Sequence, residues 1–409
     1  MSEPGAEQSS ARTAPLAGVR VLDLTNVLAG PFACHQLAHM GADVLKVEAV
    51  GRGDLARNLG ADADLSAKGM GVSFLAQNAG KRSIALNLKH PEGKAALLRL
   101  VDTADVLVEN FRPGVMERLG LGHQVLRARR PQLIYCAISG YGQTGPWTDR
   151  PAYDQIVQGA AGVMSITGDA GTGPTRVGYP LADTVGGLTA AMAICGALNA
   201  PERGGFIDVS MLESVLATMG WVVSNHLVAG VEPAPQGNEN PTSAPSGTFQ
   251  CADGPLNIAA NRDTQWEALA HHLGRDDLLE NPDYATREDR KRNRARLRAE
   301  LETVLQTRNA RDWARELCAI GVPAGAVMTV PEILDHPQVA DRSFLAHFQE
   351  VTGVGRPVDL VRTGYQIDGV RPSVDSPPPA LGSDTDATLQ QLGYSRDQIA
   401  ALRAEGAVG

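Results

Sequence analysis

One acidic residue of this chain, Asp183, has surroundings that suit covalent chemistry. It lies in the segment YPLADTVGGLTAAMAICGAL, at the predicted start of a helix. Taken alone, an aspartate in this place is an N-cap that accepts hydrogen bonds from the first turn. The positive end of a helix also favours an ionised carboxylate, and Gly186 and Gly187 place no side chains beside it. An ionised, uncrowded carboxylate is what a nucleophilic aspartate requires, so both interpretations stay open.

A glycine-rich segment, GYGQTG (140–145), directly follows a predicted strand. In a dinucleotide-binding fold such a segment follows the first strand, opens a helix and precedes an acidic residue by about 20 positions. Here it follows the fifth predicted strand, and Pro146 and Trp147 come next. An oxidoreductase site for nicotinamide or flavin is therefore disfavoured, which leaves a plain turn or a mobile loop at a ligand site.

His35 and His39 are four residues apart on a predicted helix, a spacing that could bind a metal ion. No glutamate lies between them as in HExxH, and no third ligand is evident nearby. We therefore expect a packed or surface pair and no metal site. The sequence also contains no GxSxG elbow and no P-loop, which disfavours serine hydrolysis and nucleoside-triphosphate chemistry.

The composition is that of an ordinary soluble protein of two or three domains, with 409 residues, 43% of them hydrophobic and 20% charged. The formal net charge of -9 disfavours general binding to nucleic acid or to an anionic membrane. Residues 1–15 are predicted to be a disordered leader rather than a signal peptide. Apolar stretches such as LTAAMAICGAL are expected to be too short to span a bilayer. These features predict a cytoplasmic protein without nucleic-acid or membrane partners.

The elements that must position Asp183 alternate between strands and helices. Five strands are predicted at residues 19–26, 42–49, 82–88, 105–111 and 133–139. Most are apolar nearly throughout, as expected of strands covered on both faces. Strand and helix in alternation predict a right-handed, mostly parallel α/β sheet.

The character of the chain changes near residue 232. Residues 206–230 read as a last strand that runs into a long helix, and the Pro/Gly/Ser/Asn-rich segment 232–247 marks a boundary. Beyond it we predict a hairpin about Asp253 and Gly254, then charged helices to about Ile320. These elements form a smaller α+β domain. A linker, a strand-like stretch (RPVDLVRTGYQI) and a final helix follow.

Five blocks occur in an order that resembles the class III CoA-transferases, the CaiB/BaiF family. They are LAGVRVLDLTNVLAGPFACHQLAHMGADVLKVE, NAGKRSIALNLKHPEGK, DVLVENFRPGVMERLGLG, LIYCAISGYGQTGP and RPAYDQIVQGAAGVMSITG. The resemblance extends from about Leu16 to the C-terminus. It implies a Rossmann-like large domain and ring-shaped chains interlaced in a homodimer. The implied boundaries are a large domain at 16–205, a linker helix at 206–235, a small domain at 236–325, a linker at 326–345, and a C-terminal segment at 346–409 that completes the large domain.

The resemblance makes Asp183 the nucleophile of a CoA transfer, in a site between subunits. The carboxylate would attack an acyl-CoA thioester and pass through a mixed anhydride to an enzyme-bound thioester. Backbone amides near Gly140 and Gly142 are candidate donors to the oxyanion, as is the loop at Gly237 and Asn238. Asp154 is a candidate to assist the nucleophile, although a carboxylate that merely starts a helix is an equal alternative.

Coenzyme A carries several phosphate charges and needs local basic groups on this acidic chain. The family's CoA-contact segments resemble nine residues here: Leu28, Ala29, Lys81, Arg82, Leu86, Asn110, Arg112, Arg118 and Leu119. Without the resemblance, a solvated surface charge is an equal interpretation of each arginine.

Two branches of the family differ at Tyr153. The α-methylacyl-CoA racemases resemble this chain with a histidine at that position, which moves the α-proton together with the same aspartate. Because a tyrosine phenol is a poor base near neutral pH, the transferase is favoured and the racemase is the alternative. Leu28, Ala49 and the loop 237–245 depart from the formyl-CoA/oxalate enzymes. We therefore predict a short-chain or dicarboxylic acyl-CoA and a small carboxylic acid as substrates, with Leu28, Tyr153 and this loop shaping the acid's pocket.

Overall fold

The computed structural model describes residues 14–409, so nearly all of the predicted leader lies outside the described residues. The chain forms two compact units. The first comprises the residues up to 163 together with 177–229 and 337–409, and the second comprises 164–176 and 230–336. Residues 164–176 were expected in the large domain but group with the second unit, where the Gly237 N–H donates to the Gly168 carbonyl (2.7 Å). The other predicted boundaries stay predictions.

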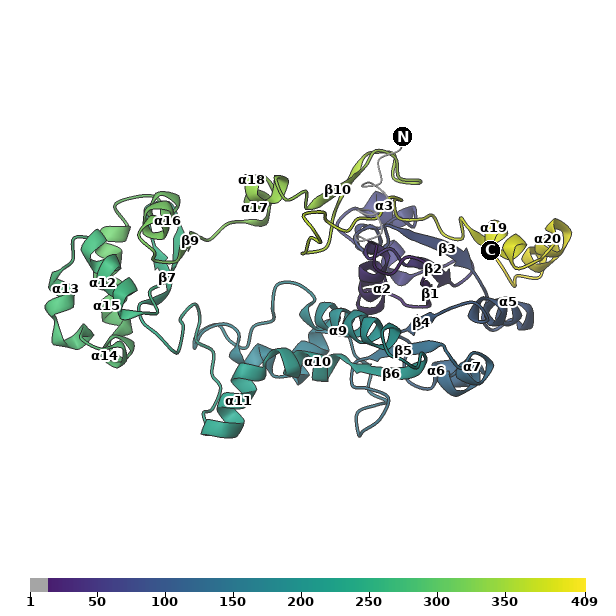
Figure 1. Cartoon of the computed structure of the whole chain (residues 1–409), viewed down its shortest axis with the longest axis horizontal. Helices are drawn as coiled ribbons and strands as arrows, with labels where there is room; N and C mark the ends of the chain where they lie inside the picture. The colour runs from purple at the N-terminus through teal and green to yellow at the C-terminus, as the bar shows by residue number, and fades with distance from the viewer. Residues whose placement is uncertain (1–13) are drawn as a thin grey trace. The chain divides into compact units, whose positions relative to one another are not determined.

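The first unit is built on one six-stranded sheet (Figure 1). Its strands are β1 (Arg20–Asp23), β2 (Asp43–Glu48), β3 (Lys81–Ala85), β4 (Val106–Glu109), β5 (Ile134–Ser139) and β6 (Gly205–Ser210). All neighbours are parallel, in the order β3-β2-β1-β4-β5-β6, which confirms the predicted parallel α/β sheet. In sheets of this order ligands bind outside the carboxyl ends of the strands, where the order reverses between β1 and β4.

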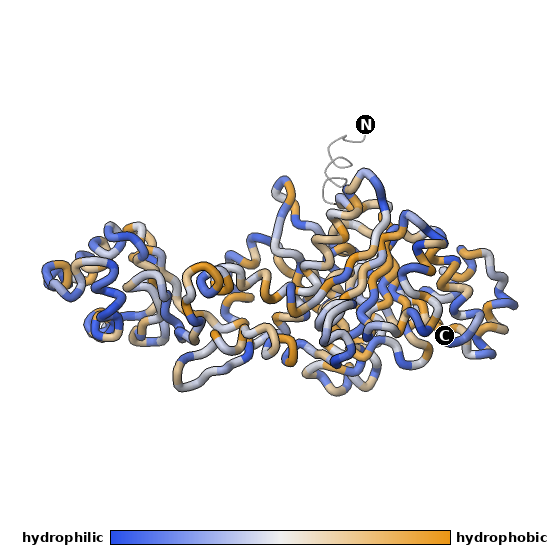
Figure 2. The backbone as a smooth tube through the Cα atoms, turned by 90° about the horizontal axis from the view of Figure 1, so that it is seen from below, coloured by the Kyte–Doolittle hydropathy of each residue, from blue (hydrophilic) through white to orange (hydrophobic). Residues whose placement is uncertain are grey.

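Helices cover both faces of the sheet, because successive side chains of each strand point to opposite faces. Along β4, Val106 and Val108 pack on one apolar core and Leu107 on the other. The first core includes helices α2 (Ala29–His39), α9 (Leu181–Leu198) and α10 (Met211–Thr218). The second includes α5 (Pro91–Val101), α7 (His123–Arg129), α19 (Thr385–Gln391) and α20 (Arg396–Ala404). Figure 2 shows the hydrophobic residues concentrated along these strands and the helices on them.

The helix predicted after the last strand is divided in two. α10 ends at Thr218, and α11 (Gly220–Ala229) begins immediately after Met219. Glycine is a weak helix former, which accounts for a break at this point. No residue of α11 is buried within the chain, and its apolar side chains Trp221, Leu227 and Val228 are exposed.

The C-terminal segment belongs to the first unit. A hairpin of β10 (Leu345–Phe348) and β11 (Val358–Val361) precedes α19. The strand predicted at 356–367 is thus shorter than expected. Ser83 of β3 donates its N–H to the Asp384 carboxylate, and the Asp384 N–H donates to the Ser83 carbonyl. These bonds attach the last helices beside β3.

The second unit contains a three-stranded antiparallel sheet of β7 (Ser246–Gln250), β8 (Pro255–Ala259) and β9 (Ala324–Ala326). The turn between β7 and β8 contains Asp253 and Gly254, which confirms the predicted hairpin. The helices are α12 (Asp263–His272), α13 (Asp277–Glu280), α14 (Arg287–Arg292), α15 (Arg294–Leu305) and α16 (Ala310–Ala319). One sheet face packs on their apolar residues, such as Trp266 and Leu301.

The remaining elements are short. They are the 3-10 helices η1 (Leu55–Asn58), η2 (Val163–Ile166) and η3 (Pro282–Tyr284), and the helices α3 (Ala63–Ala67), α4 (Val72–Leu75), α6 (Val115–Arg118), α8 (Asp154–Ala160), α17 (Val330–Leu334) and α18 (Pro337–Ala340).

Among the described residues, one helix, α9, is long and apolar enough to cross a membrane by length and composition. The expectation that every apolar stretch is too short is therefore wrong for this helix. A core helix of a soluble protein meets the same criterion. Within the first unit, α9 packs against α2 and α10 on one face of the sheet.

Candidate active site

The carboxyl edge of the parallel sheet gathers the candidate residues. The helices α2 and α9 both lie on crossovers between parallel strands, so both run opposite to the strands and begin at this edge. The loops that follow β1, β4 and β5 begin at the same edge. They carry Leu28, Asn110 and Gly140, one from each loop.

Asp183 is the third residue of α9 and is half-buried. The N-cap is Pro180, so the interpretation of Asp183 as the capping aspartate is wrong. Asp154, at the start of α8, performs that function from another helix. Its Oδ1 accepts the N–H groups of Ala182 (2.8 Å) and Asp183 (3.3 Å), and its Oδ2 accepts Gln158 Nε2 (2.7 Å). The first turn of α9 therefore donates to Asp154 and leaves the Asp183 carboxyl without those bonds.

This arrangement changes the expected charge of Asp183. Burial, together with the negative charge of Asp154, raises the pKa of Asp183 to about 7. The expectation that the helix terminus keeps this carboxylate firmly ionised is therefore wrong. Near neutral pH, Asp183 is divided between an acid and a carboxylate.

The glycines of α9 do not clear space around Asp183 as expected. A Cβ at Gly187 would lie 2.6 Å from the Ala29 carbonyl oxygen, and one at Gly186 would lie 2.9 Å from Met211 Cγ. They allow α9 to pack closely on α2 and α10 instead. Since residues four apart share a helix face, Asp183 lies on the Gly187 face, one turn toward the carboxyl edge. This places it beside the start of α2, where Leu28 is the N-cap and Ala29 is buried.

The loop after β1 is held in a strained conformation that the sequence does not reveal. Val27 has a φ of 68°, which is rare for a β-branched residue and costs about 1–3 kcal/mol. Its N–H donates to Asp54 Oδ1 (2.9 Å), and Lys46 Nζ forms an ion pair with the other oxygen of Asp54 (2.9 Å). Strain that is held in place this way is typical of a ligand site.

Asn110 joins this loop to the loop after β4. Its Oδ1 accepts the Asn26 N–H, and its Nδ2 donates to the Asn26 carbonyl, both at 2.8 Å. The Asn110 amide is therefore engaged in fixing the two loops at the point where the strand order reverses.

The basic residues of the next segment are accessible. Arg112 and Arg118 are exposed, and Leu119 is half-buried. Gly114, with a φ of 80°, turns the chain between the arginines, and its Cβ position lies 2.9 Å from Arg118 Nη1. Two guanidinium groups thus belong to one tight loop at the carboxyl edge, which suits an anionic ligand.

The structure gives Lys81, Arg82 and Leu86, in and directly after β3, partners or surroundings other than this site. Lys81 is 2% exposed, and its ammonium donates to Asp23 Oδ2, the Pro31 carbonyl and Asn78 Oδ1. All three of its donor positions are thus satisfied inside the unit. Arg82 pairs with Asp43, the first residue of β2, and Leu86 is buried in the core. The Arg82 pair therefore lies toward the amino edge of the sheet, away from Asp183.

The GYGQTG segment is a loop, and the chain forms no helix between this segment and Asp154, where α8 begins. The Gly142 N–H donates to Ser139 Oγ (2.9 Å), so in this conformation it is not available to an oxyanion. A Cβ at Gly140 would meet that of Ala152 at 2.3 Å, which requires glycine there. Tyr153 is the N-cap of α8 and is 68% exposed. The roles predicted for these residues stay predictions.

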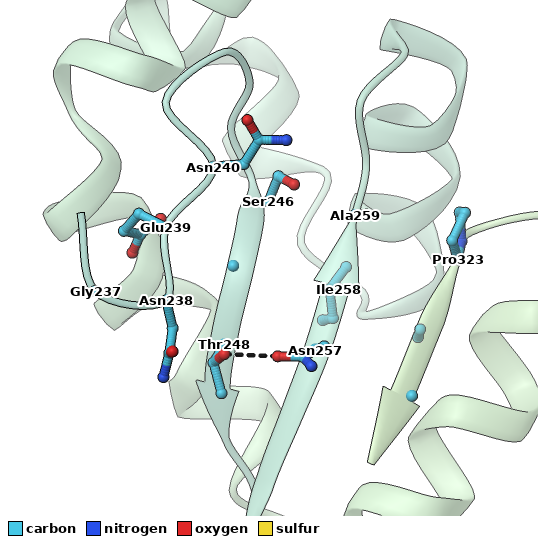
Figure 3. Close-up of a pocket in the computed structure, with 13 residues that line it drawn as sticks. Gly237, Asn238, Glu239, Asn240, Ser246, Thr248, Asn257, Ile258, Ala259 and Pro323 are labelled. Carbon is cyan, nitrogen blue, oxygen red and sulfur yellow. Dashed lines mark hydrogen bonds between the residues drawn. The ribbon is translucent and has the colours of Figure 1, made fainter. Parts of the chain in front are cut away.

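The loop 237–245 contributes to a cavity of about 630 Å³ within the second unit (Figure 3). Its polar lining includes Asn238 and a pair in which Thr248 Oγ1 donates to Asn257 Oδ1 (2.6 Å). Glu239 also lines it, but its carboxylate pairs with Arg294 and Arg298. The lining carries no free cation, so this cavity suits a neutral polar group better than a carboxylate.

His35 and His39 form a packed, buried pair. His35 Nδ1 bonds the Ala79 carbonyl (3.1 Å), and the two Nε2 atoms lie 3.1 Å apart. Burial is the main cause that lowers both pKa values, that of His39 to about 4. Across residues 14–409 no cluster of three or more His, Cys, Asp or Glu residues could hold a metal ion.

Comparison with known proteins identifies the family of this chain. The description of CoA-transferase family III matches residues 16–385. An acetyl-CoA:oxalate CoA-transferase of Acetobacter aceti is 40% identical over 362 residues, which cover 88% of this chain and 92% of that protein. A succinate–glutarate CoA-transferase of Agrobacterium fabrum is 38% identical, with 93% and 96% covered. A CaiB/BaiF family crystal structure from Brucella suis superposes with a TM-score of 0.82 at 34% identity, with 93% of this chain and 100% of that chain covered.

These likenesses span both units of the chain and include enzymes of a single reaction type. The chain belongs to CoA-transferase family III and is a CoA-transferase.

Proposed function

We propose that this enzyme moves CoA from a short-chain or dicarboxylic acyl-CoA to a small carboxylic acid, with Asp183 as the nucleophile. The observation that carries the proposal is the place of Asp183. It lies in the first turn of α9 at the carboxyl edge of the sheet, half-buried, and its own carboxyl is not consumed by capping. The names of the relatives, which transfer CoA to oxalate or between succinate and glutarate, support small acids as substrates.

The reaction proceeds through acyl transfers at this carboxyl. The Asp183 carboxylate attacks the thioester carbonyl, the C–S bond breaks, and CoA leaves as a thiolate from a mixed anhydride. The thiolate then attacks the aspartyl carbonyl, which releases the donor acid and leaves an aspartyl-CoA thioester. The acceptor carboxylate attacks that thioester to form a second anhydride, and the returning thiolate attacks its acyl carbonyl. The new acyl-CoA leaves, and Asp183 is free again.

The basic loop after β4 would hold the phosphates of CoA. Arg112 and Arg118 are exposed there, and Asn110 fixes the loop to Asn26 in the loop after β1. Lys81, Arg82 and Leu86 receive no part in this proposal, because their side chains are paired or buried elsewhere.

The test is mass spectrometry of the protein after incubation with a series of short acyl-CoAs. We expect the peptide that contains Asp183 to gain the mass of CoA less one water, as for an aspartyl-CoA thioester, and an added carboxylic acid to release this adduct. The releasing acid identifies the acceptor. Absence of an adduct with every donor, in a protein that binds CoA, would contradict the proposed intermediate.

A racemase that uses Asp183 as an acid/base group is the second candidate, since a pKa of about 7 also suits proton transfer. It lacks a partner base, because Tyr153 carries a phenol and is exposed. Deuterium exchange at the α-carbon of a 2-methylacyl-CoA tests it, and no exchange rejects it.

We also propose that the enzyme is a homodimer, interlaced as the family resemblance implies, with sites between subunits. The support is α11, where Trp221, Leu227 and Val228 are 70%, 76% and 87% exposed. Three large apolar side chains on one helix of ten residues are costly in water and suit burial against a second copy. A cytoplasmic location stays a prediction.

We expect Leu227→Glu to dissociate the dimer and to abolish transfer, because the glutamate would bury a charge in the interface. Analytical ultracentrifugation measures the mass and a coupled assay the activity. The control is Val125→Glu on α7, a valine that is 52% exposed within the first unit and should leave both unchanged. A Leu227→Glu protein that stays dimeric would show that α11 is not in the interface.

A further inference from the structure

Glu109 is a buried acid at the carboxyl edge to which the transfer mechanism gives no task. It is the last residue of β4 and is 5% exposed. Its Oε2 accepts the Phe111 N–H (2.8 Å), and its Oε1 accepts a longer bond from Tyr135 Oη (3.4 Å). Throughout the described chain, no Lys, Arg or His forms an ion pair with it. A buried carboxylate without a cation is unfavourable.

The groups around Glu109 reinforce this effect. The titratable side chains near it are Glu117 on α6, His123 on α7 beside Tyr135, Tyr135 on β5 and Asp208 on β6, with Cys136 of β5 on the opposite face of the sheet. Burial raises the pKa of Glu109 to about 8, and the negative charges of Glu117 and Asp208 add to the rise. The bonds from Phe111 and Tyr135 oppose it only in part. At neutral pH the carboxyl is mostly protonated.

The Phe111 N–H lies at the centre of the loop that follows β4. On one side Asn110 is tied to Asn26, and on the other Arg112 and Gly114 lead into α6. The Glu109 carboxyl oxygen that accepts this N–H therefore fixes the conformation in which the loop leaves β4. Asp208 does the same for the loop after β5, because its Oδ2 accepts the Gln143 N–H (2.9 Å).

We propose that Glu109 is a positioning residue that holds the loop from Asn110 to Gly114 in the conformation that receives CoA, through its bond to the Phe111 amide. The inference rests on the proposed function, in which this loop contacts CoA. The neutral acid performs the task. Ionisation at alkaline pH places an unpaired charge under the loop, so the carboxyl must draw in water and the loop loosens.

The first measurement is calorimetric titration of the dimer with CoA at about pH 7 and about pH 9.5. We expect wild-type affinity to fall at least about tenfold at the higher pH, since most Glu109 carboxyls are then ionised. Glu109→Gln keeps the accepting oxygen and cannot ionise, so its affinity should equal the wild-type value at pH 7 and change little. Glu109→Ala should bind CoA weakly at both pH values, because it has no oxygen to accept the Phe111 N–H. Glu405→Gln is the control and should keep the wild-type profile, because this exposed glutamate follows α20 and is not among the groups that shift the pKa of Glu109.

A second measurement separates this proposal from the proposed function. Hydrogen exchange of residues 110–114 is followed without CoA over the same pH range and corrected for intrinsic rates. Wild-type protection should fall above about pH 8, and Glu109→Gln protection should not. The role of Glu109 is overturned if the wild type and Glu109→Gln lose the same protection at alkaline pH, or if the wild type loses none. Failure of the wild type to bind CoA refutes the proposed function instead, and hydrogen exchange then decides the positioning role alone.

Discussion

Asp183→Asn is expected to abolish CoA transfer and, at the same time, to stabilise the folded enzyme. Asparagine has the shape of aspartate but no anionic oxygen to attack a thioester, so kcat should fall at least about ten-thousand-fold. CoA binding should persist, because the basic loop after β4 is unchanged. Asp183→Ala should lose the same activity without the gain in stability, since it leaves a cavity beside α2.

The gain in stability follows from the pKa of Asp183. That value is about 7 in the folded chain and about 4 in an unfolded one. Between these values the folded state binds more protons, so the free energy of unfolding falls as the pH rises. Above about pH 7 Asp183 is ionised in both states, and the folded state bears the full cost of burying its charge. Asparagine removes this cost because it has no charge. We expect a gain on the order of 2 kcal/mol at pH 8 and none at pH 4, measured by urea unfolding. If Asp183→Asn changed the free energy of unfolding by the same amount at both pH values, the pKa of Asp183 would not be raised. Retained turnover in this variant would exclude Asp183 as the nucleophile.

Asp154→Asn is expected to move the pH dependence of the enzyme. Because the carboxylate form of Asp183 attacks, kcat/KM should rise with pH through about 7. Asparagine at 154 can still accept the Ala182 N–H, but it removes the negative charge that raises the pKa of Asp183. The acid limb should therefore shift to lower pH, with turnover near pH 5 several-fold above the wild type. The bond from Gln158 is lost, at a cost of about 1 kcal/mol.

The comparison with Asp154→Ala isolates the charge from the cap. Alanine removes both, so the profile should shift as for asparagine while stability falls by about a further 1 kcal/mol. Initial rates between about pH 5 and 9, with unfolding at pH 7, measure the two effects. An acid limb that stays in place in both variants would mean that another group controls it.

The sheet could be predicted because the patterns that specify its strands lie within short stretches of the sequence. Most of the predicted strands are apolar nearly throughout, and the hairpin at Asp253 and Gly254 has its turn residues in place. The division between α10 and α11 was missed, since Gly220 interrupts an otherwise helical pattern by a single residue. The end of a helix depends on propensity differences of about 1 kcal/mol, which a pattern does not resolve.

The place of Asp183 near the start of a helix could be predicted from the sequence, but its surroundings could not. The position of Asp183 in the helix followed from sequence, whereas its pKa depends on Asp154, which lies 29 residues away. Lys81 shows the same limit, because the Asp23 carboxylate that binds it is 58 residues away. One signal was available: Lys46 in the apolar strand ADVLKVEA must find a buried partner, and its partner Asp54 also holds Val27.

The reciprocal amide bonds between Asn26 and Asn110 have a thermodynamic consequence for ligand capture. They make the loops after β1 and β4 a single preorganised body, so little loop entropy remains to be lost when a ligand joins them. A flexible, highly charged molecule such as CoA then bears most of the ordering cost itself. Association should accordingly be a single kinetic phase whose rate depends on ionic strength, since no slow rearrangement of these loops has to precede or follow the encounter.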